Sequence, residues 1–265
     1  MNSKLRVCAA GTVVLACLLA SSHTHAEQIG PYSIRNLTLG SGTVRIDGGP
    51  PDWGYFHPGS PQWINENRGL RIRADNNMDQ TWAWLGLGLG VGVTDDVELG
   101  GLLLPIRMRP DSDIDDLELY GRFAFLDGTF EMAGQATVQL PTQTEPGLGL
   151  GLPMLVHATR AMRIDTGAEV EVLFWEDTVV SLDLPLAFTW DLGRAGFLGL
   201  RTGMYYWDMD ALLIPAGIHG GGVLADGRVD IAGWFTWPGF LATERNDALE
   251  VNTFELGFGV NARID

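Results

Sequence analysis

The sequence predicts an all-β protein: a single antiparallel transmembrane β-barrel of about twelve strands, with about fourteen as the alternative, behind a cleaved signal peptide. Three observations predict this fold. From about residue 64 onward, apolar residues recur with a period of two, which is the period of a strand. Charged residues keep to one face of these segments. Turn-forming residues separate the segments at regular intervals.

Residues 1–26 have the composition of a secretory signal peptide. Two basic residues open it, an apolar run follows over 7–20, and Thr24 and Ala26 occupy the −3 and −1 positions of a cleavage site. A transmembrane anchor is the alternative, but it needs about 20 apolar residues, more than this run provides. We therefore expect the chain to be exported.

Composition argues against several classes of protein. The net charge is −16, and losing the signal makes the chain more acidic still, so binding to a nucleic-acid backbone is not expected. Cys8 and Cys17 both lie in the signal, which leaves the mature chain without disulfides or thiolate metal ligands. After the signal, no stretch reaches the roughly 18 consecutive apolar residues of a spanning helix.

Twelve segments show the strand period. Between 129 and 140, for example, Phe130, Met132 and Val138 share one face, while Glu131 and Gln135 share the other. Each segment has roughly the 9–11 residues that a tilted membrane-spanning strand needs, or slightly more. The predicted strands lie near 64–74, 80–93, 96–107, 115–126, 129–140, 147–157, 161–174, 178–190, 195–207, 212–224, 228–240 and 250–264.

The connections between these segments alternate in character. Tight turns, several with Asp-Gly chemistry, are expected at 94–96, 126–128, 159–160, 191–194 and 225–227. Longer acidic loops are expected at 108–114, 141–146, 175–177, 208–211 and 241–249. This asymmetry is typical of outer-membrane barrels, in which the short turns are periplasmic. An even number of strands places both termini in the periplasm.

Residues 27–63 do not continue the pattern. Residues 43–46 have the alternation of a further strand, but breakers follow at 48–51 and 57–61. We expect an N-terminal segment that lies in the lumen or along the periplasmic rim, with the barrel itself spanning 64–265.

The separation of charge favours a membrane barrel over a soluble β-sandwich or lipocalin-like barrel. A soluble barrel turns its apolar face inward, whereas an arginine facing lipid at mid-membrane costs about 2–4 kcal/mol, so lipid-facing positions exclude charge. The opposite, polar face should line the lumen. The predicted lumen-lining residues are Arg71, Arg73, Glu98, Glu118, Arg122, Glu131, Arg163, Asp165, Glu169, Glu171, Asp183, Arg201, His219, Asp230, Glu255 and Arg263.

Two further patterns bear on the barrel. Aromatic residues gather near the predicted strand ends, as in the two aromatic belts of membrane barrels, although ordinary core aromatics are the alternative. Prolines at 105, 153, 185, 215 and 238 fall inside predicted strands. Each removes a ladder hydrogen bond, so we expect bulges there or strands that end early.

Three motifs resemble a known family. Residues 92–100 (GVTDDVELG), 116–122 (DLELYGR) and 149–153 (GLGLP) are similar to segments of outer-membrane channels of the phenol-degradation-pathway (MetA-like) transporter type. The resemblance implies a small barrel in the bacterial outer membrane, with lipid, lipopolysaccharide and the barrel-insertion machinery as partners. The chain departs from such barrels at its end, which reads Arg263-Ile264-Asp265 where an aromatic residue is usual.

No catalytic, cofactor or metal motif is recognisable in the sequence. The lumen face carries nine acids and six arginines, which favours a narrow passive channel for small solutes with a weak preference for cations. A closed structural barrel, in which these charges pair and fill the lumen, is the alternative. A barrel-type hydrolase is a third reading, and it needs a serine or aspartate beside His157 or His219.

Overall fold

The computed structural model describes residues 36–48, 69–75, 81–114, 116–142, 146–174, 178–193, 195–243 and 253–264. The expected signal peptide, His57 and parts of the acidic loops lie outside the described residues. The described part is almost entirely antiparallel strand. None of its helices is long and apolar enough to cross a membrane.

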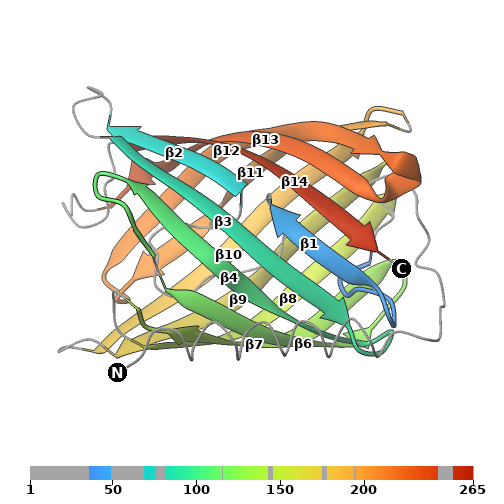
Figure 1. The fold of residues 1–265 in the computed structure, drawn as a ribbon, viewed down its shortest axis with the longest axis horizontal. Coiled ribbons are helices and arrows are strands. Elements are labelled where there is room, and N and C mark those ends of the chain that lie inside the picture. The colour runs from blue at the N-terminus through green and yellow to red at the C-terminus, as the bar shows by residue number, and fades with distance from the viewer. Residues whose placement is uncertain are drawn as a thin grey trace.

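Fourteen strands form one sheet, in which neighbours along the chain are mostly neighbours in space (Figure 1). The strands are β1 (Val44–Gly48), β2 (Gly69–Asp75), β3 (Thr81–Gly92), β4 (Val97–Arg109), β5 (Asp113–Ile114), β6 (Leu117–Leu126), β7 (Phe130–Leu140), β8 (Gly147–Thr159), β9 (Met162–Phe174), β10 (Thr178–Asp191), β11 (Gly196–Trp207), β12 (Ala211–Leu224), β13 (Val229–Ala242) and β14 (Thr253–Ile264), with a 3₁₀ turn, η2, at Ala225–Gly227.

The sheet closes because β1 and β2 share one position in the wall, between β3 and β14. In β1, Gly48 pairs with Val260, and in β2, Leu70 pairs with Phe258, so the two short strands continue each other along β14. Both also pair with β3. Figure 1 shows them one after the other between these neighbours. With β5 as a two-residue addition to β4, the wall has twelve positions, and the predicted twelve-stranded barrel is confirmed.

The wall begins earlier in the chain than the sequence indicated. Val44–Gly48 forms β1, whereas the sequence pattern predicts that the barrel starts near residue 64. The alternation over 43–46 was the sign of this strand. Five residues are shorter than an ordinary spanning strand, and β1 completes the wall only because β2 continues it.

The two ends of the barrel differ in their connections. At one end, here called the turn end, the links are 93–96, 127–129, 160–161, 192–195 and 225–228. At the other, the loop end, the strands are joined through 76–80, 110–116, 141–146, 175–177, 208–210 and 243–252. Two of the loop-end connections, 175–177 and 208–210, are as short as the tight turns, so the expected asymmetry holds for the other four.

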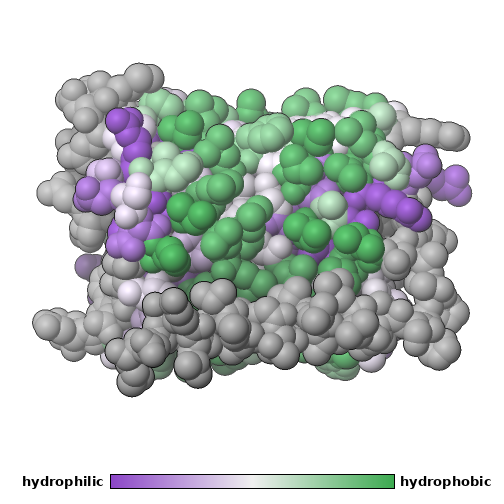
Figure 2. Space-filling view, viewed as in Figure 1, coloured by the Kyte–Doolittle hydropathy of each residue, from purple (hydrophilic) through white to green (hydrophobic). Residues whose placement is uncertain are grey.

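Burial is inverted relative to a soluble protein. On β9, Arg163 is 0% exposed and Glu169 is 2% exposed, while Val170 between its charged neighbours is 42% exposed. The same alternation runs through β6, β7, β10 and β14. Figure 2 shows apolar residues over the middle of the outer face and hydrophilic ones toward its two ends. Exposing such an apolar surface to water is unfavourable, whereas lipid can cover it. The arrangement therefore excludes the soluble sandwich.

Pro215 and Pro238 lie at one irregularity of the wall, whereas Pro153 and Pro185 lie where the register of the strands does not shift. At Pro215 the β12–β13 register shifts between Ile214 and Ala216, as expected for a bulge. Pro185 and Pro215 also share a local arrangement, because a threonine of a neighbouring strand donates its hydroxyl to the proline carbonyl at 2.9 Å in each case, from Thr166 and Thr202 respectively.

The aromatic belts are present only in part. Phe125, Phe130, Trp237 and Phe240 are 40–55% exposed on the outer face. Several other belt candidates point inward instead and are buried. The reason is the pleat: neighbouring aromatics such as Tyr205, Tyr206 and Trp207 cannot all face lipid. The inward ones are Phe197, Tyr205 and Trp207.

Close packing inside the barrel depends on glycine at particular positions. An ideal Cβ at Gly257 would lie 1.9 Å from Cε2 of the buried Trp234. Gly134, on the outer face of β7, has nothing within 4 Å of the corresponding point. The indole of Trp234 therefore lies against the bare backbone of β14.

We predict that Gly257→Ala destabilises the barrel by about 1–3 kcal/mol, the usual cost of overpacking. The matched substitution Gly134→Ala should leave stability unchanged within error. Urea unfolding of the protein reconstituted in lipid measures both. Equal stability of the two variants would contradict the packing described for Trp234.

Candidate functional site

The interior of the barrel is the candidate site. The structure places all sixteen predicted lumen-lining residues at buried positions, and none is more than 8% exposed. In a closed single-layer wall, a buried side chain on a face opposite exposed apolar residues points inward.

Ion pairs fill the turn half of the interior. Arg45 Nε lies 2.5 Å from Asp47 Oδ1, and Arg45 Nη2 lies 3.1 Å from Glu98 Oε1. Tyr120 donates its hydroxyl to the same Glu98 oxygen at 2.6 Å. The sequence reasoning missed Arg45 and Asp47, because they belong to the short strand β1. Their alternation with Val44 and Ile46 was the available signal.

Three further contacts lie in this half. Arg163 on β9 binds Asp165 two residues along the same strand. Arg263 Nη1 on β14 lies 2.9 Å from Asp230 Oδ2 on β13. On β6, Arg122 donates to the side-chain carbonyl of Gln135 at 2.7 and 3.1 Å. Because buried charges without partners are costly, these pairs hold the turn half in one arrangement.

The residues before β1 lie inside the barrel. The backbone amide of Leu37 donates to Glu131 Oε2 at 2.6 Å, and the amide of Leu39 donates to Glu98 Oε2 at 3.0 Å. Arg122 Nη1 donates to the Leu37 carbonyl at 2.6 Å. Leu37 and Leu39 are each 1% exposed. The segment 36–43 therefore crosses the inner face of β4, β6 and β7, and it narrows the turn end of the lumen.

We predict that Leu37→Asp with Leu39→Asp releases this segment. The substitutions add two negative charges to a segment whose backbone amides bind Glu131 and Glu98, and they remove the apolar contacts of the two leucine side chains. Single-channel conductance in a planar bilayer should rise by a few-fold. Leu192→Asp with Leu224→Asp adds the same charge at exposed turn-end positions and serves as the control. An unchanged conductance in the first variant would mean that the segment does not limit the path.

The loop half of the interior divides its charges between two sides. Arg73 Nη2 lies 3.2 Å from Glu255 Oε2, and the guanidinium carbon of Arg71 lies 4.1 Å from the centroid of the Trp84 ring. These arginines belong to β2. In the ring of twelve wall positions, β9 is six positions from β2 and therefore faces it across the lumen. The loop half of β9 carries Glu169 and Glu171.

The acidic side is a cluster of four carboxylates, here called the acidic wall: Glu118 on β6, Glu169 and Glu171 on β9, and Asp183 on β10. All four are at most 8% exposed. Glu169 and Asp183 are direct cross-strand partners. The acidic wall and the arginines of β2 thus give the loop half an uneven charge distribution, with acids in excess on one side.

The two described histidines bind neighbouring side chains. His157 Nε2 lies 2.7 Å from Glu131 Oε1, and His219 Nε2 lies 2.9 Å from Thr189 Oγ1. These partners are a glutamate and a threonine, whereas a barrel-type hydrolase needs a serine or an aspartate beside one of the histidines. Thr189 is 0% exposed, so a substrate carbonyl could not approach its hydroxyl. Among the described residues, no group of three His, Cys, Asp or Glu side chains is arranged to hold a metal ion.

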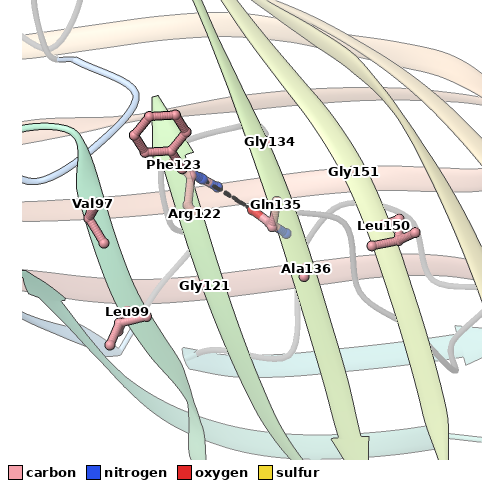
Figure 3. Close-up of a pocket in the computed structure, with 10 residues that line it drawn as sticks. All are labelled: Val97, Leu99, Gly121, Arg122, Phe123, Gly134, Gln135, Ala136, Leu150 and Gly151. Carbon is pink, nitrogen blue, oxygen red and sulfur yellow. Dashed lines mark hydrogen bonds between the residues drawn. The ribbon is translucent and has the colours of Figure 1, made fainter. Parts of the chain in front are cut away.

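The outer wall has a shallow hollow of about 550 Å³ over β4, β6, β7 and β8 (Figure 3). Gly121, Gly134 and Ala136 leave space between the larger side chains of Leu99, Phe123 and Leu150. Leu150 is 70% exposed. The hollow faces outward, and its apolar border suits a lipid chain, so it is not part of the interior path.

Comparisons with known proteins agree on the fold. No family model matches the sequence, and no curated protein matches it significantly. The NanC porin structure is similar at a TM-score of 0.55 and 9% identity, covering 74% of this chain and 98% of that chain. The KdgM porin in complex with disordered oligogalacturonate is similar at 0.54 and 6% identity, with the same coverage.

A third structure matches over more of the chain. An outer-membrane channel from Pseudomonas putida F1 is similar at a TM-score of 0.57 and 11% identity, covering 92% of this chain and 100% of that chain. At these identities the likeness shows the fold alone. The fold is that of bacterial outer-membrane channels, which agrees with the predicted outer-membrane location.

Proposed function

We propose that the protein is a narrow passive channel for small solutes in the bacterial outer membrane, with a weak preference for cations. The observation that carries the proposal is the barrel interior, which buries charged side chains inside a wall whose outer face is apolar. Adding Arg45 and Asp47 to the sixteen predicted residues gives ten acids and seven arginines. An excess of acids in a narrow path raises the local concentration of cations.

Outer-membrane lipid, lipopolysaccharide and the barrel-insertion machinery are the proposed partners. Membership of the MetA-like transporter type is part of the same proposal. It is supported by the positions of the resembling motifs: 92–100 forms the β3–β4 hairpin and 116–122 enters β6, the strands that carry Glu98 and Glu118. The KdgM structure contains an oligogalacturonate, which is anionic. The acid excess here makes anionic sugars a poor fit for this interior.

We predict that the purified protein passes potassium more readily than chloride. In a planar bilayer under a potassium chloride gradient, the sign of the reversal potential should show this preference. The ratio of potassium to chloride permeability should be a few-fold at low salt. It should be smaller at 1 M salt, where the Debye length falls to about 3 Å and the interior charges are screened. Anion preference would overturn the cation assignment while leaving the channel intact.

A closed structural barrel is the second candidate, and one observation favours it. The segment 36–43 and the ion pairs around Glu98 and Glu131 fill the turn half. The same bilayer recording separates the two candidates. Absence of conductance in wild type and in the Leu37→Asp, Leu39→Asp variant would favour the closed barrel.

A further inference from the structure

The segment that precedes β1 is held by side chains that bind its backbone. At Leu37, Glu131 accepts the amide N–H at 2.6 Å and Arg122 donates to the carbonyl at 2.6 Å, so both polar backbone groups of one residue are bound. Two residues along, Glu98 accepts the amide N–H of Leu39 at 3.0 Å. Amide and carbonyl groups are common to all peptides, so these contacts do not require the bound residues to belong to this chain.

The wall positions both carboxylates through contacts that do not involve the segment. Glu131 Oε2 accepts from the segment, whereas Glu131 Oε1 lies 2.7 Å from His157 Nε2 on β8. Glu98 Oε2 accepts from the segment, whereas Glu98 Oε1 accepts the Tyr120 hydroxyl of β6 at 2.6 Å. Because each carboxylate has a separate contact in the wall, it should keep its position when the segment leaves. The site is therefore preorganised for another ligand.

The same site has an apolar part. Leu37 packs against Ala133 and Leu155, which are each 0% exposed. These two are inward-facing residues of β7 and β8, in an interior that is otherwise rich in charge. Leu39 lies separately against β3, where a Cβ on Gly90 would lie 3.2 Å from Leu39 Cδ1. The interior thus has two apolar places for side chains two residues apart, each beside a carboxylate that binds an amide.

We propose that the turn half of the interior is a binding site for short apolar peptides, and that residues 37–39 occupy it as a tethered ligand. The contacts fit a peptide because they combine an acceptor for N–H, a donor to C=O and an apolar place for the side chain of the same residue. The inference rests on the proposed function for the entry of a free peptide, and it names such peptides as a class of solute.

A tethered ligand competes with a free one for the same site. Because the segment is joined directly to β1, its effective concentration at the site is on the order of millimolar or higher. A free peptide should therefore bind wild type poorly, and its binding should increase once the segment is weakened. The Leu37→Asp, Leu39→Asp variant is suited to this test, because its segment lacks both leucine side chains.

The test is calorimetric titration of an acetylated and amidated peptide with the sequence of residues 36–39 into this variant in detergent. The dissociation constant should be about 0.1–1 mM, since a short peptide loses conformational freedom on binding. Wild type should bind the peptide at least about tenfold more weakly, because its own segment competes. A peptide N-methylated at its first leucine lacks the N–H that Glu131 accepts, so it should bind the variant about tenfold more weakly.

Two further substitutions in the same variant test the residues of the site. Glu131→Gln removes the charge beside the first amide and should weaken peptide binding a few-fold, whereas Asp226→Asn removes an exposed charge at the turn end and should leave it unchanged. The shift in gel mobility on heating verifies folding. If the aspartates prevent folding, Leu37→Ala with Leu39→Ala weakens the segment without added charge. Absence of binding, equal binding to wild type, or equal binding of the methylated peptide would each overturn the site.

A bilayer measurement separates this inference from the channel proposal. The peptide, added at millimolar concentration on the turn side, should reduce the potassium current of the variant and leave that of wild type nearly unchanged. A variant that conducts and binds no peptide overturns the peptide site alone. Peptide binding by a protein that does not conduct overturns the channel alone.

Discussion

Backbone hydrogen bonding in lipid is the constraint on which the structure depends. Hydrocarbon offers no partner to an N–H or C=O group, so a sheet in a membrane has to close on itself. Here closure is achieved by β1 and β2, which together occupy the last position between β3 and β14. The bulge at Pro215 and the threonine hydroxyls bonded to the Pro185 and Pro215 carbonyls are tolerated because they do not open the ring.

Once the ring is closed, the period of two determines where everything else goes. Alternate side chains meet lipid and must be apolar, and those between them meet in an enclosed interior. That interior has two regions of different character. In the turn half, acids and arginines pair with each other and with the backbone of Leu37 and Leu39. In the loop half, acids crowd β9 and β10 while Arg71 and Arg73 lie on the facing strand. Ion pairs and hydrogen bonds thus hold the turn half together, whereas the loop half carries the larger excess of acids.

Most of the wall could be predicted from the sequence, because the alternation of apolar and polar residues repeats several times along each long strand. The segment 161–174, with four charges on one face and aliphatic residues on the other, leaves little choice. β1 has only five residues, too few for its alternation to repeat, so the sequence pattern predicts no wall strand there. The sequence also predicts fuller aromatic belts than the structure has. The place of an aromatic residue near a strand end indicates its depth in the membrane, but it does not determine whether the side chain faces the lipid or the lumen. The contacts of Leu37 and Leu39 join residues 59–94 positions apart, and no local pattern indicates them. Nor could local pattern show which interior acids have partners.

The position of the segment 36–43 has a consequence for biogenesis. It directly precedes β1, and β1 is one of the two strands against which β14 completes the wall. The segment is therefore inside a cylinder whose final seam joins the two ends of the chain. If the seam formed first, the leading residues would have to be threaded through a finished and crowded opening. The simpler order is for these residues to fold against β4, β6 and β7 while the cylinder is still an open trough, so that the last strand closes over contents already in place.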